Sequence, residues 1–124
     1  MKESLTESPA KLPNPGPDLR RGDVWWVRLD PTAGSEIRKT RPCLIITANL
    51  VNQHRRTAVV IPLSSSPSAS PPLLVPITCA GKAAVAVMDQ VRAVAKERFV
   101  ERMGAASLQD MEAVESGLRQ ILEL

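Results

Sequence analysis

The sequence predicts a mainly β fold with helices (α+β), in the form of a small, mostly antiparallel barrel with one C-terminal amphipathic helix. Short apolar runs rich in Val and Ile recur at short intervals, separated by turn-forming Gly, Pro, Asn and Ser. Only the end of the chain shows a clear helical spacing of apolar residues. With 124 residues, 44% of them hydrophobic and 23% charged, the chain suits one domain that can bury a core.

The first two expected strands lie on either side of a long loop. The stretch GDVWWVRLD is a strand by composition and ends at an Asp-Pro turn. Alternation places Trp25 and Trp26 on opposite faces, so one belongs in the core and the other needs a cover from a loop, a second subunit or a ligand. Residues 31–41 form a loop too long for a tight hairpin. Pro42 then fits the first residue of the strand PCLIITA, whose continuous apolar character predicts burial on both faces.

Further strands follow in the second half of the chain. NLVNQHRR connects to the strand TAVVIPL, and SSSPSASPP forms a polar loop broken by prolines. LLVPITC and AAVAVMDQVRAVA complete the strands and are joined by a turn at AGK. The segment KERFVERMG is ambiguous: it fits a helical turn around residues 96–99, which a short strand can follow.

The closing helix has the clearest signals. Ser107 is a plausible N-cap, and Asp110, three residues later, makes a variant of the capping box. Glu112 and Glu115 lie off the apolar stripe, so the stripe packs onto the sheet rather than onto a membrane or a cofactor. The stripe consists of Leu108, Met111, Val114, Leu118, Ile121 and Leu122.

Composition sets the boundaries and the setting of the domain. Residues 1–19 hold four prolines and little apolar content, which predicts a disordered arm ahead of a folded domain at 20–124. The apolar runs are too short to span a bilayer and the N-terminus lacks the apolar segment of a secretory signal, so we expect a cytoplasmic protein. Cys43 and Cys79 form no CxxC pair, and we expect buried free thiols rather than a disulfide or a zinc site.

Positive charge gathers in one part of the chain. The net charge of +3 is mild, but residues 20–66 carry eight basic against three acidic residues. This excess falls on predicted loops, where it can converge on an anion. A solvated surface is the other interpretation, and the two stay open on these observations alone.

The residue types exclude several chemistries and suit one. GxGxxG and Walker motifs are missing, and the single histidine, His54, cannot supply a paired acid and base. What remains is a set that suits attack by an RNA 2′-OH on its own phosphodiester, because the protein then needs only to orient the bond and stabilise the phosphorane charge. A non-catalytic basic surface is the alternative. The set is Glu36, Arg38, Lys39, Arg41 and the serines after the third strand.

Four stretches occur in a characteristic order between residue 20 and the C-terminus. They are RGDVWWVRLDPTAGSEIRKTRPCLII, TAVVIPLSSS, VMDQVRAVAKERF and MGAASL…LRQILEL. In this order, over about 105 residues, the chain resembles the MazF/PemK family, the sequence-specific endoribonucleases of bacterial toxin–antitoxin pairs.

This resemblance implies an SH3-like barrel of five or six strands with appended helices, working as a homodimer. Single-stranded RNA would lie in a groove across the dimer and be cut by attack of its 2′-OH, without metal or cofactor. The products would carry a 2′,3′-cyclic phosphate and a 5′-OH. A cognate antitoxin would block the groove with an acidic segment and supply the link to DNA, and the implied setting is the bacterial cytoplasm.

The resemblance also implies catalytic residues. Arg41, in the R-P step, matches the family's catalytic arginine, and Glu36, in G-x-E, matches a loop carboxylate that serves as base or loop organiser. Ser64 stands where the family usually carries a catalytic threonine, and it lacks the methyl group that restricts χ1. Ser65 is a substitute for the same role.

Substrate contacts are implied at several further positions. Gln90 and Arg92 match the family's D/E-Q-x-R strand and would contact bases or shape the groove, although Gln90 also suits a hydrogen bond within the dimer or barrel. Asn52 is equally open to interpretation as a turn residue. The complete set of expected contacts is Arg38, Lys39, Thr40, Asn52, Ser65, Gln90 and Arg92.

Two other classes of function compete with this prediction. The first is a non-catalytic SH3-like module that binds nucleic acid without cleaving it. The second is a gyrase-inhibiting toxin of the same fold; such toxins resemble one another in a C-terminal Trp-Gly-Ile, whereas this sequence has ILEL there, which counts against that function.

Overall fold

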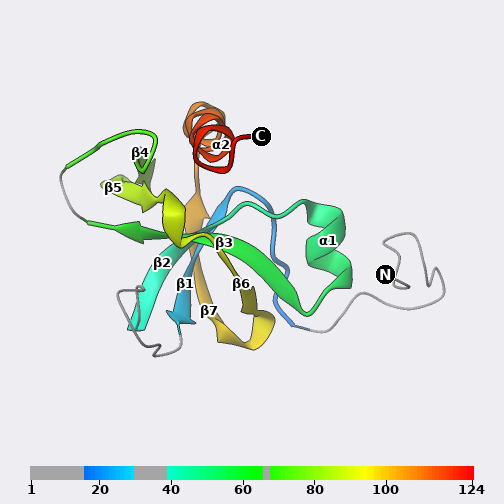
Figure 1. The fold of residues 1–124 in the computed structure, drawn as a ribbon. Coiled ribbons are helices and arrows are strands. Elements are labelled where there is room, and N and C mark those ends of the chain that lie inside the picture. The colour runs from blue at the N-terminus through cyan, green and yellow to red at the C-terminus, as the bar shows by residue number, and fades with distance from the viewer. Residues whose placement is uncertain (1–15, 30–38, 66–67) are drawn as a thin grey trace.

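The computed structural model describes residues 16–29, 39–65 and 68–124, which form an antiparallel β structure with a C-terminal helix (Figure 1). The strands are β1 (Asp23–Leu29), β2 (Lys39–Ile45), β3 (Thr57–Ser64), β4 (Leu74–Cys79), β5 (Lys82–Val87), β6 (Arg92–Ala95) and β7 (Phe99–Ala105). The α-helices are α1 (Asn49–His54) and α2 (Leu108–Leu122), and the 3-10 turns are η1 (Met88–Gln90) and η2 (Lys96–Arg98).

The strands pair in the order β4-β5-β3-β2-β1-β7, and β6 adds to β3. All described pairs are antiparallel. The strand order has two ends, β4 and β7. They approach each other closely at Gly104 of β7, because a Cβ added there would lie 3.2 Å from the Cys79 sulfur of β4. The mainly antiparallel architecture is confirmed, with seven strands in the described residues rather than five or six; closure of a barrel stays a prediction.

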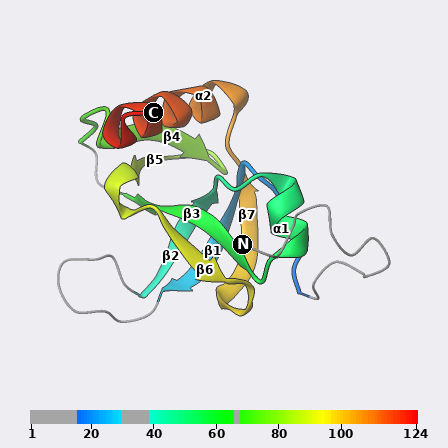
Figure 2. The same cartoon turned by 45° about the vertical axis from the view of Figure 1, so that its right-hand side comes forward.

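β3 is the strand that divides the structure into two layers. Its start pairs with β6 over Thr57–Val60, whereas its end leaves β2 and pairs with β5 at Leu63 and Ser64. Figure 2 shows the result: the β4–β5 hairpin lies under α2 at the top, and β1, β2, β6 and β7 form the layer below.

The sequence AAVAVMDQVRAVA, expected as one strand, is two strands with η1 between them. The single-strand prediction was wrong because β5 and β6 pair with different ends of β3, and the chain has to turn between these ends. The turn is anchored by Met88, which is fully buried. Periodicity alone does not reveal such a break, since apolar residues continue through it.

Two core clusters lie on opposite faces of β1, β2 and β3. The first contains Leu44 and Ile61 with Met88 and Val114, and it fills the space under the β4–β5 hairpin and α2. The second contains Cys43, Ile45 and Phe99. Because successive residues of β2 enter different clusters, the expected burial of this strand on both faces is confirmed.

Helix α2 begins and docks as its polar residues predict. The Asp110 backbone N–H donates to Ser107 Oγ at 3.0 Å, which confirms the N-cap, and the Thr78 N–H of β4 donates to Asp110 Oδ2 at 2.9 Å. Met111 and Val114 are buried against the first cluster. Leu108, in contrast, is 86% exposed, so the apolar stripe is narrower than predicted at its start.

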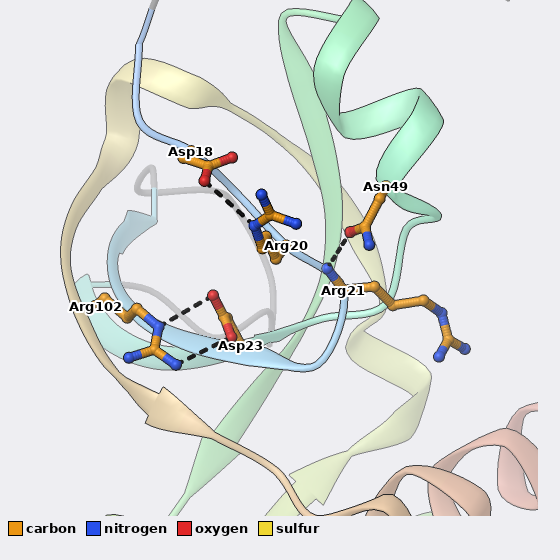
Figure 3. Close-up of polar contacts among 6 residues, drawn as sticks. All are labelled: Asp18, Arg20, Arg21, Asp23, Asn49 and Arg102. Carbon is orange, nitrogen blue, oxygen red and sulfur yellow. Dashed lines mark hydrogen bonds and ion pairs between the residues drawn. The ribbon is translucent and has the colours of Figure 1, made fainter.

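The start of the domain is held by polar contacts on three elements. The Arg21 backbone N–H donates to Asn49 Oδ1 of α1 at 2.7 Å, and the Arg21 guanidinium donates to Glu115 of α2 at 2.9 Å. Figure 3 shows the first of these contacts beside the ion pair of Asp23 and Arg102, which joins β1 to β7 at 3.1 Å. Leu19 is 3% exposed and belongs to the second core cluster, so packing begins one residue before the expected boundary at residue 20.

Two further expectations need correction. NLVNQHRR was expected as a connection but contains α1, a helix of six residues without a side-chain cap, which is too short to leave an apolar stripe in the sequence. Pro42 was expected to begin its strand but is the fourth residue of β2. It is tolerated there because pairing with β3 starts only at Cys43, so Pro42 has one partner strand. The helical turn and strand expected in KERFVERMG are confirmed as η2 and β7.

Among the described residues, no helix is long and apolar enough to cross a membrane.

Gly117 sets the distance between α2 and the layer below it. A Cβ at Gly117 would lie 3.1 Å from Met88 Cε, 3.2 Å from the Pro72 carbonyl oxygen and 3.3 Å from Val75 Cγ2. We expect Gly117→Leu to lower the free energy of unfolding by about 1–3 kcal/mol through overpacking. Denaturant unfolding at one fixed protein concentration measures this change. The matched control is Ala113→Leu, at an exposed position of the same helix, which should stay within about 0.5 kcal/mol of the wild type.

Candidate functional site

A pocket of about 260 Å³ lies where β2 and β3 separate. One wall comes from β1 and β2 and the other from β5, with the end of β3 between them. Most of the lining is apolar, and the polar side chains are Thr40 and Arg41 of β2, Ser64 at the end of β3, Ser65 after it, and Lys82 of β5.

The pocket brings Arg41 and Ser64 together from neighbouring strands. The last described pair of β2 and β3 is Cys43 with Pro62, and beyond it Arg41 lies on β2 while Ser64 pairs with Val85 of β5. Both line the pocket, and Ser65 follows on the exposed side. Arg41 is exposed, so its guanidinium can reach a ligand from solvent. The sequence-predicted arginine and hydroxyl groups therefore share one site.

The remaining candidates from the same loop are placed only in part. Thr40 lines the pocket next to Arg41. Lys39 is exposed at the first position of β2, and its φ of +71° is in the left-handed region, where a non-glycine residue is strained. Glu36 and Arg38 lie outside the described residues.

Gln90 and Arg92 lie beside this site rather than in the pocket lining. Arg92 begins β6 and pairs with Val60 of β3, and Gln90 is the last residue of η1, so it is not in a strand as the motif suggested. The positive charge of Arg92 acts on the Cys43 thiol, which places the guanidinium near β2. Cys43 belongs to the second core cluster, so the charge of Arg92 acts on the face of β2 opposite to Pro42, which lines the pocket.

Asn52 has a structural position that does not suit substrate contact. Its side chain is 1% exposed, and its Nδ2 donates to the Thr47 carbonyl oxygen at 2.9 Å within the α1 region. It does not line the pocket. Of the two interpretations left open by the sequence, the position agrees with a turn residue, because the side chain closes the turn that leads into α1.

Lys82 and Trp26 also line the pocket, although neither was among the sequence-predicted contacts. Lys82 follows the turn of Ala80 and Gly81, whose φ values of +52° and +76° give a tight hairpin between β4 and β5. Trp26 lines the opposite wall. The turn signal AGK pointed to the lysine, and the alternation of Trp25 and Trp26 pointed to an uncovered indole, but neither pattern shows that the two residues face one cavity.

Three of the described basic residues between 20 and 66 make contacts away from the pocket. Arg20 pairs with Asp18 at 3.2 Å, the Arg21 guanidinium binds Glu115, and Arg28 donates to the Glu97 carbonyl oxygen at 3.2 Å. These contacts are spread over the surface. The charge relevant to the pocket thus comes from Arg41 and Lys82 in the described part of the chain.

Both thiols are free and buried, as expected. Burial raises the pKa of Cys43 from 9.0 to about 12, and the nearby charge of Arg92 offsets only part of this effect. Burial also raises the pKa of Cys79, which lines the pocket beside the Arg102–Asp23 pair. The thiols are therefore protonated at neutral pH and are poor nucleophiles.

Comparison with known proteins gives a consistent relationship over the folded domain. The sequence pattern of the PemK-like, MazF-like toxins of type II toxin–antitoxin systems matches residues 20–122. Endoribonuclease PemK of Escherichia coli is 50% identical over 48 residues, which are 39% of this chain and 36% of that protein. Endoribonuclease MazF9 of Mycobacterium tuberculosis is 29% identical over 115 residues, covering 86% of this chain and 98% of that protein.

Solved structures share the fold. MazF from Deinococcus radiodurans superposes with a TM-score of 0.76 at 22% identity, covering 86% of this chain and 97% of that one. An endoribonuclease in complex with its cognate antitoxin, from a mycobacterial species, superposes with a TM-score of 0.70 at 21% identity, covering 86% and 96% of the two chains.

The raised thiol pKa values predict slow alkylation of the folded protein. At pH 8, a thiol with a pKa of about 12 is ionised in on the order of one molecule in ten thousand. We expect iodoacetamide to leave Cys43 and Cys79 unmodified in buffer and to modify both in denaturant, as measured by intact mass. Because folding favours the protonated form, stability should fall as the pH rises above the ordinary value of 9.0. Rapid alkylation of Cys43 in the folded protein would contradict its burial.

Proposed function

We propose, because the chain belongs to the PemK-like, MazF-like toxins of type II toxin–antitoxin systems, that it is a ribosome-independent, sequence-specific endoribonuclease of single-stranded RNA. It would act in the bacterial cytoplasm, where its substrate is found. Relatives named as endoribonucleases cover 86% of the chain, which supports this reaction.

The observation that carries the proposal is the meeting of Arg41 and Ser64 at one pocket. The substrate supplies the nucleophile, its own 2′-OH, which attacks the adjacent phosphorus and expels the 5′ oxygen. A 2′,3′-cyclic phosphate and a 5′-OH result, and no metal is required by this scheme. The proton of the 2′-OH has to leave and the 5′ oxygen has to receive one, so an acid and a base assist.

Each residue has a role that its chemistry suits. The Arg41 guanidinium would donate to the phosphorane oxygens, because its planar fork matches their geometry and keeps its charge. The Ser64 hydroxyl would hydrogen-bond the phosphate or relay the proton to the leaving oxygen. Glu36 remains the proposed base or loop organiser, by the family motif alone. Lys39 and Thr40 would contact the backbone of the strand on either side.

We further propose that the enzyme is a homodimer inhibited by a cognate antitoxin. The support is the family and the solved complexes of similar proteins, including the MazE–MazF complex of Deinococcus radiodurans. An acidic segment would suit the positive charge of Arg41 and Lys82 at the pocket. DNA would be reached only through the antitoxin.

Removal of the Arg41 guanidinium tests the reaction. Purified protein is incubated with a long mixed-sequence RNA in the presence of EDTA, and the new 5′ ends are mapped. We expect discrete cuts with the wild type and a rate about 10²–10³ lower for Arg41→Ala, because one charge-stabilising donor is lost. Arg56→Ala, an exposed arginine away from the pocket, serves as the matched control and should cut at the wild-type rate.

The alternative function is a binding module without catalysis. RNA that stays intact with a folded dimer of the wild-type protein would favour it and would overturn the endoribonuclease proposal. In that case Arg41→Ala should only weaken RNA binding.

The two serines allow the hydroxyl role to be assigned. We expect Ser64→Ala to slow cleavage about 10²–10⁴-fold, because a positioned proton donor is lost, and Ser65→Ala to change it less than about threefold. Ser64→Thr should keep the activity, since the hydroxyl remains and the added methyl group restricts χ1. Single-turnover rates on one mapped site measure all three variants. A large loss in Ser65→Ala with an active Ser64→Ala would move the role to Ser65.

A further inference from the structure

The two adjacent tryptophans have different surroundings. The Trp25 ring packs edge-on against Phe99, with 6.0 Å between ring centroids and 80° between the ring planes, at the second core cluster. Trp26 points to the other face of β1, is half-buried and lines the pocket. Trp26 is therefore the tryptophan that the core does not cover, and its ring borders a cavity next to Arg41.

The pocket, called the slot below, is lined by an aromatic residue on the β1–β2 side and by small residues on the β5 side. Trp26 and Pro42, which are partners across β1 and β2, lie on one side, and Ala83 and Ala84 of β5 lie on the other. Its volume of about 260 Å³ is below the ~300–1,000 Å³ of pockets for drug-sized ligands. A flat ring of modest size fits such a slot, and unpaired bases of single-stranded RNA stack on aromatic side chains.

Lys82 brings a positive charge to the β5 side of this slot. The tight turn of Ala80 and Gly81 pairs Lys82 with Cys79, so the lysine is fixed at the first position of β5 and at the pocket. Its side chain is exposed. A cation at the edge of an apolar slot suits a ligand with a flat apolar ring and a phosphate beside it.

We propose that the slot holds one unpaired base stacked on the Trp26 indole, while Lys82 contacts a phosphate of the same strand from the β5 side. This inference rests on the proposed function, because it takes single-stranded RNA as the ligand. Stacking tolerates every base, since each has a π face. The slot thus strengthens the hold on the strand and places its backbone beside Arg41 and Ser64.

The two tryptophans serve as reporters in the test. The probe is a mixed-sequence single-stranded RNA with 2′-fluoro groups in place of every 2′-OH, which cannot be cleaved because it lacks the nucleophile. We expect the probe to quench the tryptophan fluorescence of the wild type and of Trp25→Phe, and not that of Trp26→Phe. Quenching that persists in Trp26→Phe would overturn the proposal, since the signal would then come from Trp25.

Affinity for the same probe measures the contribution of the ring. Trp26→Leu should raise Kd about 5–150-fold, because stacking on an aromatic side chain contributes about 1–3 kcal/mol per base. Trp26→Phe keeps a ring and should stay within a few-fold of the wild type. A Trp26→Leu protein that has the wild-type circular dichroism spectrum and the wild-type Kd would refute the stacked base.

A larger side chain on the β5 side of the slot tests the position of the base without removing a residue that contacts it. Ala83 is exposed on β5, and Ala83→Leu should weaken probe binding by about fivefold or more, because the added side chain occupies the place of the base. The matched control is Ala113→Leu on α2, away from the pocket, which should bind as the wild type does. Equal binding by the two variants would exclude the slot.

The salt dependence of binding tests Lys82. Loss of one phosphate contact to single-stranded RNA lowers the slope of log Kd against log salt concentration by about 0.7. We expect this decrease for Lys82→Ala and none for Arg119→Ala, an exposed arginine on α2. An unchanged slope in Lys82→Ala would remove the lysine from the proposal.

These binding measurements separate the inference from the reaction on which it rests. If the probe quenches Trp26 but natural RNA stays intact, the slot stands and the cleavage proposal fails. If natural RNA is cut in an Arg41-dependent way but the Trp26 variants bind and cut as the wild type does, the reaction stands and the slot fails.

Discussion

The structure depends on one strand that has to pair with three others. β3 holds β2 along one side, and its other side is divided between β6 at the start and β5 at the end. The division requires η1, which carries the chain from one partner position to the other and buries Met88. It also separates the end of β3 from β2. The pocket lies at this separation, so Ser64 owes its position to the same constraint that forms the two layers.

Only a few of the positively charged side chains that the structure describes lie at the pocket. The chain has a net charge of only +3, and several arginines near the N-terminus of the domain are engaged in contacts elsewhere on the surface. Among the described residues, the cations in the pocket lining are Arg41 of β2 and Lys82 of β5.

Local patterns predicted the elements well and their partners poorly. Alternation and turn residues found β1, β3, β4 and the Ser107 cap, since each depends on neighbours in the sequence. The break at η1 was not predicted, because it results from the pairing of β5 and β6 with different ends of β3. Arg41 and Ser64 were found through family motifs, and the structure brings them together. Asn52 was misplaced because burial of an amide is set by tertiary packing, and Lys82 was missed because its partners come from a different layer.

The slot has walls that belong to different layers, and this has a mechanical consequence. Trp26 belongs to β1, whereas Ala83 and Lys82 belong to β5, in the hairpin that lies under α2 (Figure 2). The gap between the walls is therefore set by the thickness of the first core cluster, in particular by Met88 and by the close approach at Gly117. A substitution that changes the volume of a buried side chain in that cluster would widen or narrow the slot without altering any residue of its lining. The proposed binding of RNA should therefore respond to substitutions in the hydrophobic core as well as to substitutions of the residues that contact the ligand.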